Sequence, residues 1–461
     1  MAVARSARIS LSTSFELIHR HFTRALVDEV WGSVRVTERR RVWCLWELAL
    51  FWMSVVAHAP RSLRAALAEG TGESPGRFRA PEAVPQAFFA RSQNLSWRFF
   101  AALFDRFRAR LAAAAPRTFA GALRPLLRRF GRVEAVDCSR LDPVRRRLKI
   151  LWRDRRAVLA GSLLAFYDFA TGTVSQLVFT PDAAASEFRA AIGALDRVAR
   201  GTLLVGDRLY GVQGFFRALS ARGIFGVARR SSTVKVSRVG RLSRRLGRDG
   251  AVEDWEVIAG SPDGSGPQRL RLIRLLSGGR AALELFTNVL DPRRLGADEA
   301  LVLYRRRWTI ERLFSDLKEV LGLRRFYGAN TNSVGMQVFA AAMVHTAMRV
   351  AQAMAARQAN VEPEAISPKK FFPKAAAASA GLCGSECTFD AVLRANPGLR
   401  IRKPGWHRMR YASTTLDEVR VESRRSLVRA PPRPRHTTRP GERTWRSLPR
   451  ARARSPTTRV K

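Results

Sequence analysis

Two acidic residues of this chain stand where a carboxylate could take part in chemistry. Asp137 ends the apolar stretch Val133–Val136, and Asp207 directly follows the apolar run Leu203–Gly206. A carboxylate at the end of a buried strand needs compensation, because burying an unpaired charge is costly. A single such residue is more typical of a strand-end cap or an ion-pair partner than of a catalytic group. Two at the ends of neighbouring strands can hold one hard cation, since Mg²⁺ prefers a few carboxylate oxygens together with water.

A polar stripe supplies a third acid. Arg307, Glu311 and Lys318 follow Tyr304 by three, seven and fourteen residues, which predicts that all four lie on one face of a single helix over about 297–323. Taken alone, the stripe fits an amphipathic helix in which Arg307 and Glu311 pair one turn apart. Together with the two strand-end aspartates, Glu311 completes a set of three carboxylates. Such a set is the apparatus of two-metal phosphoryl chemistry.

The charge of the chain indicates the substrate. Its 461 residues include 82 Lys and Arg against 38 Asp and Glu, which gives a formal net charge of +44. This balance excludes a small-molecule enzyme without a nucleic-acid partner and favours a protein that binds a polyphosphate. Residues 424–461 hold 13 Lys and Arg and one acid, a net of +12, so the remaining 423 residues still carry +32.

Hydrophobic periodicity predicts the elements that must position these residues. Apolar residues recur at three- and four-residue spacing over 1–130, which predicts a helical N-terminal region, and its arginine-rich faces favour DNA binding. Over 131–350 short apolar runs alternate with helical patterns, which predicts a mixed α/β domain. The runs are at 132–139, 162–167, 174–180 and 202–206, and a helical pattern covers 187–200.

Three further regions complete the predicted organisation. Strand-rich segments over about 228–287 predict a β insertion inside the α/β domain. Residues 351–423 are expected to form a C-terminal helical region suited to dimerisation. The stretch 424–461, rich in Arg, Pro and Ser, predicts a disordered basic tail.

Two features bear on the compartment. The apolar segment Val42–Ala59 carries Glu47 and has only the minimum length for a membrane span, so we expect a buried core helix and no membrane partner. Four cysteines are too few for a disulfide scaffold. The one close pair, Cys383 and Cys387, lacks further ligands for a tetrahedral zinc site. This usage is typical of a reducing compartment and predicts a cytoplasmic protein.

The stretch YRRRWTIERLFSDLK, residues 304–318, matches the Y-(2)-R-(3)-E-(6)-K signature of transposases of the insertion sequence four family. The order of VDCS, VGDRLYG and this stretch resembles the Asp-Asp-Glu (DDE) triad of that family, with a β insertion before the Glu. The resemblance covers about residues 90–350. It implies a ribonuclease-H-like catalytic core in which Asp137, Asp207 and Glu311 are catalytic and hold two Mg²⁺ ions, for which Mn²⁺ can substitute.

The resemblance also implies DNA contacts. Tyr304, Arg307 and Lys318 would contact phosphates of the transposon end, in agreement with the hydrogen bonds that these side chains can donate. In relatives an aromatic residue of the β insertion stacks on a flipped base, and Trp255 is the candidate here. A role as a core tryptophan is the more common one for such a residue. The implied partners are double-stranded DNA, at the terminal inverted repeats and the target, and a second copy in a homodimeric synaptic complex at the bacterial nucleoid.

The implied reaction is the excision and insertion of a mobile element. Water cleaves one strand and leaves a 3′-OH, which attacks the other strand to form a hairpin that is reopened before insertion. Two alternatives stay open. The chain could be a ribonuclease-H-like nuclease without strand transfer, or an inactive or domesticated DNA-binding protein with a vestigial triad. Cys138 and Leu209 stand where family members often have a small residue.

Overall fold

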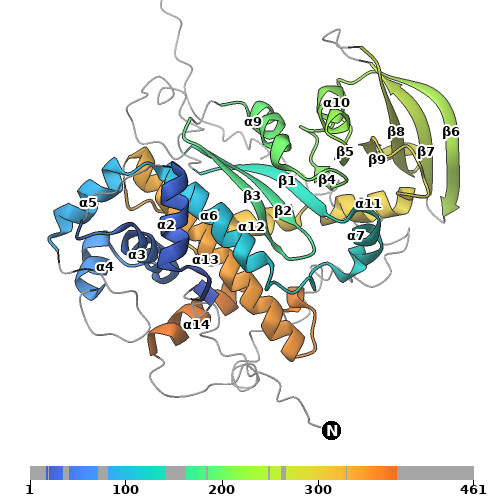
Figure 1. The fold of residues 1–461 in the computed structure, drawn as a ribbon. Helices are drawn as coiled ribbons and strands as arrows, with labels where there is room; N and C mark the ends of the chain where they lie inside the picture. Colours follow the sequence, from blue (N-terminus) through green and yellow to red (C-terminus); the bar gives the residue numbers. More distant parts are fainter. Residues whose placement is uncertain are drawn as a thin grey trace, which may run out of the picture.

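The computed structural model describes residues 17, 18, 20–34, 41–70, 81, 83–141, 161–182, 185–247, 250–260, 266–328 and 330–381. Cys383, Cys387 and the predicted basic tail over 424–461 lie outside these residues. Within the described part, a body of helices and a large curved sheet lie side by side (Figure 1).

The N-terminal part of the chain is helical. Its longest helix is amphipathic and begins at the N-cap Ser96, whose side chain accepts a hydrogen bond from the Arg98 N–H. Phenylalanine and leucine side chains form the buried stripe of this helix, as the periodicity predicts. The helices are α2 (Arg24–Val34), α3 (Leu45–His58), α4 (Leu63–Gly70), α5 (Pro85–Asn94), α6 (Trp97–Ala112), η1 (Gly121–Leu123) and α7 (Arg124–Phe130).

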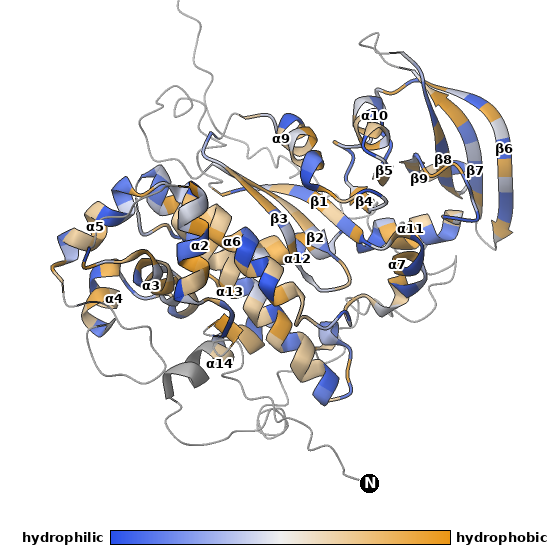
Figure 2. Ribbon diagram, viewed as in Figure 1, coloured by the Kyte–Doolittle hydropathy of each residue, from blue (hydrophilic) through white to orange (hydrophobic). Residues whose placement is uncertain are grey.

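One long helix, α13 (Thr331–Gln358), forms the centre of the helical body and packs against α3 and α6. Within the described ranges it is the one helix long and apolar enough to cross a membrane, and its apolar window is wholly buried inside the protein. Helix α3 is buried along most of its length as well, which confirms the expected core helix within Val42–Ala59. Figure 2 shows hydrophobic colours along much of the visible length of α13.

Nine strands form a single sheet in the order β3-β2-β1-β4-β5-β9-β8-β7-β6. The first three strands of the chain are antiparallel neighbours, whereas β1, β4 and β5 are parallel. The predicted mixed α/β architecture is therefore confirmed. The strands are β1 (Val133–Arg140), β2 (Ser162–Asp168), β3 (Thr173–Thr180), β4 (Leu203–Gly206), β5 (Phe225–Arg229), β6 (Val236–Gly247), β7 (Gly250–Ala259), β8 (Gln268–Ser277) and β9 (Arg280–Thr287).

The strands β6 to β9 form an antiparallel meander that extends the sheet. Strand β9 pairs with β5, with Val227 opposite Thr287, and β6 is the outer edge strand. The pairing of β6 with β7 continues to Gly247, next to the turn between the two strands. These strands therefore continue the sheet instead of forming a second one.

Helices cover both faces of the central strands. Val136 and Leu204 point into a cluster with α9 (Glu187–Ala194) and α10 (Gln213–Ala221), whereas Ala135 and Val205 belong to the larger core with the helical body. Burial on both faces explains the nearly continuous apolar runs of these strands. The helix expected over 187–200 ends earlier, since a short 3₁₀ turn, η3 (Leu195–Arg197), follows α9. The chain continues after α13 through η5 (Pro363–Ala365) into α14 (Pro368–Gly381).

The prediction of one helix over 297–323 is wrong. Helix α11 (Ala297–Arg306) ends before Arg307, α12 (Thr309–Ser315) follows, and η4 (Asp316–Val320) is a π-helical turn. The Arg307 N–H donates to the carbonyl of Tyr304, three residues earlier, at 3.1 Å. This spacing is that of a 3₁₀ turn, whereas an α-helix bonds to the fourth residue back. The four stripe residues therefore do not share one continuous helical face. No Pro or Gly causes the break, which instead coincides with burial of the Arg307 side chain.

Candidate active site

Asp137 and Asp207 lie at matching positions of two neighbouring central strands, in β1 and directly after β4. In the parallel pair of β1 and β4, Ala135 is opposite Val205, and each aspartate comes two residues later. A step of two residues keeps both on one face of the sheet. Asp137 Oδ1 accepts a hydrogen bond from the Cys138 N–H at 2.8 Å, and Asp207 Oδ1 accepts one from the Leu209 N–H at 2.8 Å. Asp207 directly follows β4, as the sequence pattern predicts, whereas Asp137 lies within β1, which continues to Arg140, so the prediction that Asp137 stands at a strand end is wrong.

Arg307 joins Asp137 to Glu311. Helix α12, which carries Glu311, packs against β1. Arg307 Nη1 lies 3.6 Å from Asp137 Oδ2, and Nη2 donates to Glu311 Oε1 at 3.2 Å. The Arg307 side chain is only 10% exposed, whereas that of Glu311 is 41% exposed. The expected Arg307–Glu311 pair therefore exists, and its guanidinium also reaches the first candidate acid.

The charges of the other two carboxylates act on Asp137. Burial raises the pKa of Asp137 to about 6. The Cys138 N–H and the Arg307 guanidinium lower this pKa, while the negative charges of Asp207 and Glu311 raise it further. The side chains from β1, β4 and α12 therefore converge on one region of negative charge.

Sequence reasoning missed a fourth acid, Glu187, at the first position of α9. The hydroxyl of Tyr210 donates to Glu187 Oε1 at 2.9 Å, and Tyr210 is fully buried against Gly206. Burial raises the pKa of Glu187 to about 7, and the charges of Asp137 and Asp207 add to this. In the sequence, a Ser followed by Glu at a helix start is typical of ordinary capping, so no motif marked this residue.

Tyr304 and Lys318 lie close to the same acids. Burial raises the pKa of Tyr304, the nearby charge of Arg307 lowers it, and its ring centroid lies 5.9 Å from the Arg307 guanidinium carbon. Lys318 Nζ donates to Ser139 Oγ at 2.6 Å and to the Arg140 carbonyl at 2.7 Å. Lys318 is thus held at the end of the strand that carries Asp137.

Trp255 lies on β7, in the meander. Its Nε1–H donates to Glu253 Oε2 at 3.1 Å, and the guanidinium carbons of Arg238 and Arg241 lie 4.5 and 5.6 Å from its ring centroid. Trp255 is partly buried against the smaller core cluster. In the described part of the chain, its polar and cation–π partners come from β6 and β7, and none of them is Asp137, Asp207 or Glu311.

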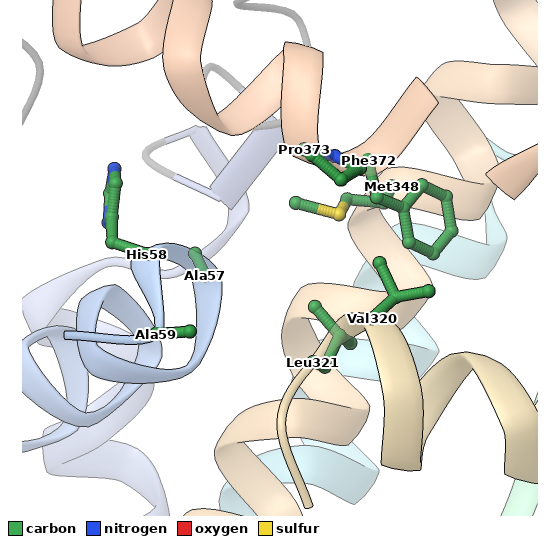
Figure 3. A pocket seen from close by; sticks show the side chains of 8 residues that line it. All are labelled: Ala57, His58, Ala59, Val320, Leu321, Met348, Phe372 and Pro373. Carbon is green, nitrogen blue, oxygen red and sulfur yellow. The ribbon is translucent and has the colours of Figure 1, made fainter. Parts of the chain in front are cut away.

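The described residues also form a pocket of about 350 Å³ at a different place. Its lining is mostly apolar and contains no acid, and it lies between the end of α3 and the helices η4, α13 and α14 (Figure 3). The lining residues are Ala57, His58, Ala59, Val320, Leu321, Met348, Phe372 and Pro373. Without acids or basic side chains other than His58, it does not suit phosphate chemistry.

The candidate acids have the right chemistry for a hard divalent cation, but their positions do not fit one. Carboxylate oxygens are the ligands that Mg²⁺ prefers. Among the described residues, however, no three His, Cys, Asp or Glu side chains lie close enough to hold a metal ion. The Arg307 guanidinium contacts Asp137 and Glu311 instead and balances their charge. In this arrangement the acids are an ion-paired cluster and not a preformed metal centre.

Comparisons with known proteins find similarity to transposases. Residues 154–347 match the family model described as "Transposase DDE domain". The protein named "Putative transposase y4zB", from Sinorhizobium fredii, is 32% identical over 167 residues, which are 35% of this chain and 46% of that protein. The chain thus spans about half the length of the curated relative that it matches.

A solved structure is also similar, the cryo-EM structure of the piggyBac transposase synaptic complex with hairpin DNA. The TM-score is 0.42 at 10% sequence identity, and the match covers 90% of this chain and 89% of that chain.

Residues 154–347 are therefore similar to the DDE domain of transposases, and the matched residues include Asp207 and Glu311. Asp137 lies before the first matched residue, on β1. The insertion sequence four family, which the residues Tyr304, Arg307, Glu311 and Lys318 indicate, is consistent with this domain.

Proposed function

We propose that this protein is a DNA transposase that cleaves the ends of a mobile element at its terminal inverted repeats and joins them to target DNA. The observation that carries the proposal is the proximity of three acids: Arg307 contacts both Asp137 on β1 and Glu311 on α12, and the charge of Asp207, directly after β4, acts on Asp137. The net charge of +44 supports a polyanionic substrate.

The catalytic core is proposed to be ribonuclease-H-like. Its support is the sheet itself, in which β3, β2 and β1 are antiparallel and β1, β4 and β5 are parallel. The positions of the acids add to this support. One lies on β1, one directly after β4, and one on a helix that follows the β meander.

Mg²⁺ is the proposed cofactor, with Mn²⁺ as a substitute, and Asp137, Asp207 and Glu311 are its proposed ligands. Arg307 offers a forked pair of donors to a phosphate, Tyr304 a hydroxyl and Lys318 a point charge. Trp255, between two arginines, offers a ring for base stacking. A homodimer in the cytoplasm is the proposed assembly, because two element ends must be brought together.

The test is a cleavage and joining assay on DNA that carries the element's own ends. Asp137→Asn, Asp207→Asn and Glu311→Gln are each expected to abolish cleavage while end binding persists. Asp196→Asn is the matched control, since its side chain is 68% exposed and pairs with Arg222 at the end of α10. Its cleavage rate should equal that of the wild type.

The products distinguish the alternatives. Joined products that depend on all three acids support the transposase. Cleavage without joining would instead identify a nuclease. End binding by a wild-type protein that cleaves no strand would identify a DNA-binding protein with a vestigial triad.

A further inference from the structure

The turn that carries Asp207 is held at its far end by close packing on β5. Asp207 directly follows β4, and the turn continues to Gly211. A Cβ atom on Gly211 would overlap the carbonyl oxygen of Arg229, the last residue of β5. The Ser231 N–H donates to the Gly211 carbonyl at 2.9 Å. Gly211 therefore lies directly on the backbone that follows the neighbouring strand.

The ring of Tyr210 supports the near end of the same turn. A Cβ atom on Gly206 would lie 2.8 Å from Tyr210 Cδ2, so the ring packs against the backbone of the residue that precedes Asp207. Tyr210 is fully buried, and its ring centroid lies 5.0 Å from that of Phe215 on α10. The position of the Asp207 backbone therefore depends on where this ring is held.

Glu187 holds the buried ring by its hydroxyl group. The Tyr210 hydroxyl donates to Glu187 Oε1 at 2.9 Å. A buried donor without an acceptor is unfavourable, so this bond stabilises the observed position of the ring. Glu187 itself is partly exposed at the first position of α9. The carboxylate thus reaches from the helix surface to a hydroxyl in the core.

Helix α9 is a firm support for Glu187. The next residue, Phe188, contacts Phe215 with the two ring centroids 6.3 Å apart. At the other end of the helix, Gln176 Nε2 on β3 donates to the Ala194 carbonyl at 3.2 Å. The helix is therefore attached at its start to α10 and at its end to the sheet, and Glu187 is fixed relative to the strands.

We propose that Glu187 and Tyr210 are positioning residues for Asp207. Their hydrogen bond fixes the Tyr210 ring on Gly206, and the ring fixes the turn whose first residue is Asp207. This inference rests on the proposed function, in which Asp207 is a catalytic acid. A misplacement of about 1 Å can cost about 100-fold in the rate of a reaction, so support of this kind has a measurable effect.

Three variants of the full-length protein test the hydrogen bond. Tyr210→Phe removes the donor, Glu187→Ala removes the acceptor, and Glu187→Gln keeps an acceptor oxygen. Hydrogen–deuterium exchange without DNA, followed by mass spectrometry, measures how firmly the turn is held. The Leu209 and Gly211 amides report on it, because they donate to Asp207 Oδ1 and to the carbonyl of Arg208.

The two deletions should loosen the turn to different extents. Exchange of the turn peptide should be about 5–100-fold faster in Glu187→Ala, which leaves a buried hydroxyl without an acceptor. In Tyr210→Phe it should be about 2–10-fold faster, because the partly exposed Glu187 can bond to water instead. Exchange in the β meander should not change in either variant. Glu187→Gln should exchange like the wild type.

Cleavage of DNA that carries the element's own ends gives a second measurement. Glu187→Ala and Tyr210→Phe should lower kcat by about 10–100-fold while KM stays within about twofold, and Glu187→Gln should recover most of the rate. Tyr327→Phe is the matched control, because it removes another tyrosine hydrogen bond, to the Pro60 carbonyl at 2.6 Å in the helical body. It should change neither the exchange of the turn nor kcat.

Two results would overturn the positioning role. One is wild-type exchange of the turn in both deletions, which would mean that other contacts hold Asp207. The other is faster exchange throughout the chain without recovery in Glu187→Gln, which would reduce the pair to a contribution to overall stability. If Tyr210→Phe does not fold, Glu187→Ala and Glu187→Gln still decide between these results.

Failure of this inference is distinguishable from failure of the proposed function. A wild-type protein that cleaves nothing, with a turn that loosens in Glu187→Ala, loses the proposed function and keeps the support of Asp207. A wild-type protein that cleaves and joins DNA, with an unchanged turn and kcat in both deletions, keeps the proposed function and loses the positioning role.

Discussion

A buried ion pair between two strands of the meander gives a prediction whose size follows from the structure. Arg271 on β8 and Asp254 on β7 are 0% and 1% exposed. The guanidinium donates two hydrogen bonds to the Asp254 carboxylate and one each, at 2.9 Å, to the carbonyls of Val289 and Leu295. The two carbonyls belong to the segment between β9 and α11. The pair therefore ties the meander to the helix that carries Tyr304.

Asp254→Ala should destabilise the protein strongly, because it leaves a buried guanidinium without its counter-charge. Removal of one partner of a buried pair costs about 3–5 kcal/mol. The matched control is Glu256→Ala. Glu256 pairs with Arg269 on the same two strands, but these side chains are 20% and 61% exposed. Loss of this pair, whose arginine is exposed, should lower the free energy of unfolding far less than loss of the buried pair.

The assay is unfolding in urea, followed by circular dichroism, with the change in the free energy of unfolding taken from the midpoint shift at equal slope. The reasoning is refuted if Asp254→Ala and Glu256→Ala shift the midpoint equally. Such a result would mean that water reaches Arg271 or that another acceptor replaces Asp254.

Three further predictions concern Asp137, Glu134 and Lys318. The cleavage rate should fall as the pH falls through about 6, because Asp137 has its pKa raised to about 6 and must be ionised; a rate that is flat from pH 7 to 5 would contradict this. Burial raises the pKa of Glu134 on β1 to about 7. Between about pH 4.5 and 7 the folded state therefore binds more protons than the unfolded chain. The free energy of unfolding should rise as the pH falls through this window. Glu134→Gln should remove that dependence and stabilise the protein at pH 8 by up to about 3 kcal/mol in thermal melts, and an unchanged pH profile would argue against it. Lys318→Met should weaken DNA binding and reduce the slope of log affinity against log salt by about 0.9 in fluorescence anisotropy, with an unaltered slope excluding a phosphate contact.

Local patterns in the sequence were enough to predict most of the sheet and its two aspartates. Strands β1 to β4 are buried on both faces, so their apolar runs, bounded by turn residues, predict the strands to within a few positions. The end of β4 then indicates where Asp207 stands, whereas β1 continues beyond Asp137 to Arg140. These features follow from residues that are adjacent in the sequence, so the sequence alone can predict them.

The remaining features depend on contacts between distant segments. The turn at Arg307 interrupts a stretch with continuous helical periodicity, and it coincides with contacts to β1 that no local pattern contains. Glu187 lies near Asp137 only because α9 packs over the sheet. The roles of Tyr304, Lys318 and Trp255 toward DNA stay predictions, since their contacts here are within the protein.

Because the nine strands form one sheet, the strand pairs that close it differ in how far apart they lie in the sequence. Strand β5 receives its outer neighbour only when the chain, after passing through β6, β7 and β8, returns as β9, about sixty residues later. Contacts of this separation form late, because closing a long loop costs entropy before pairing repays it. Until then β5 is an open edge that could pair with other chains. A shortened chain without the meander would keep that edge permanently, so the meander cannot be removed as a module. Glu311 follows β9 in the chain, so during synthesis the last of the three acids emerges only after the edge of β5 can be closed.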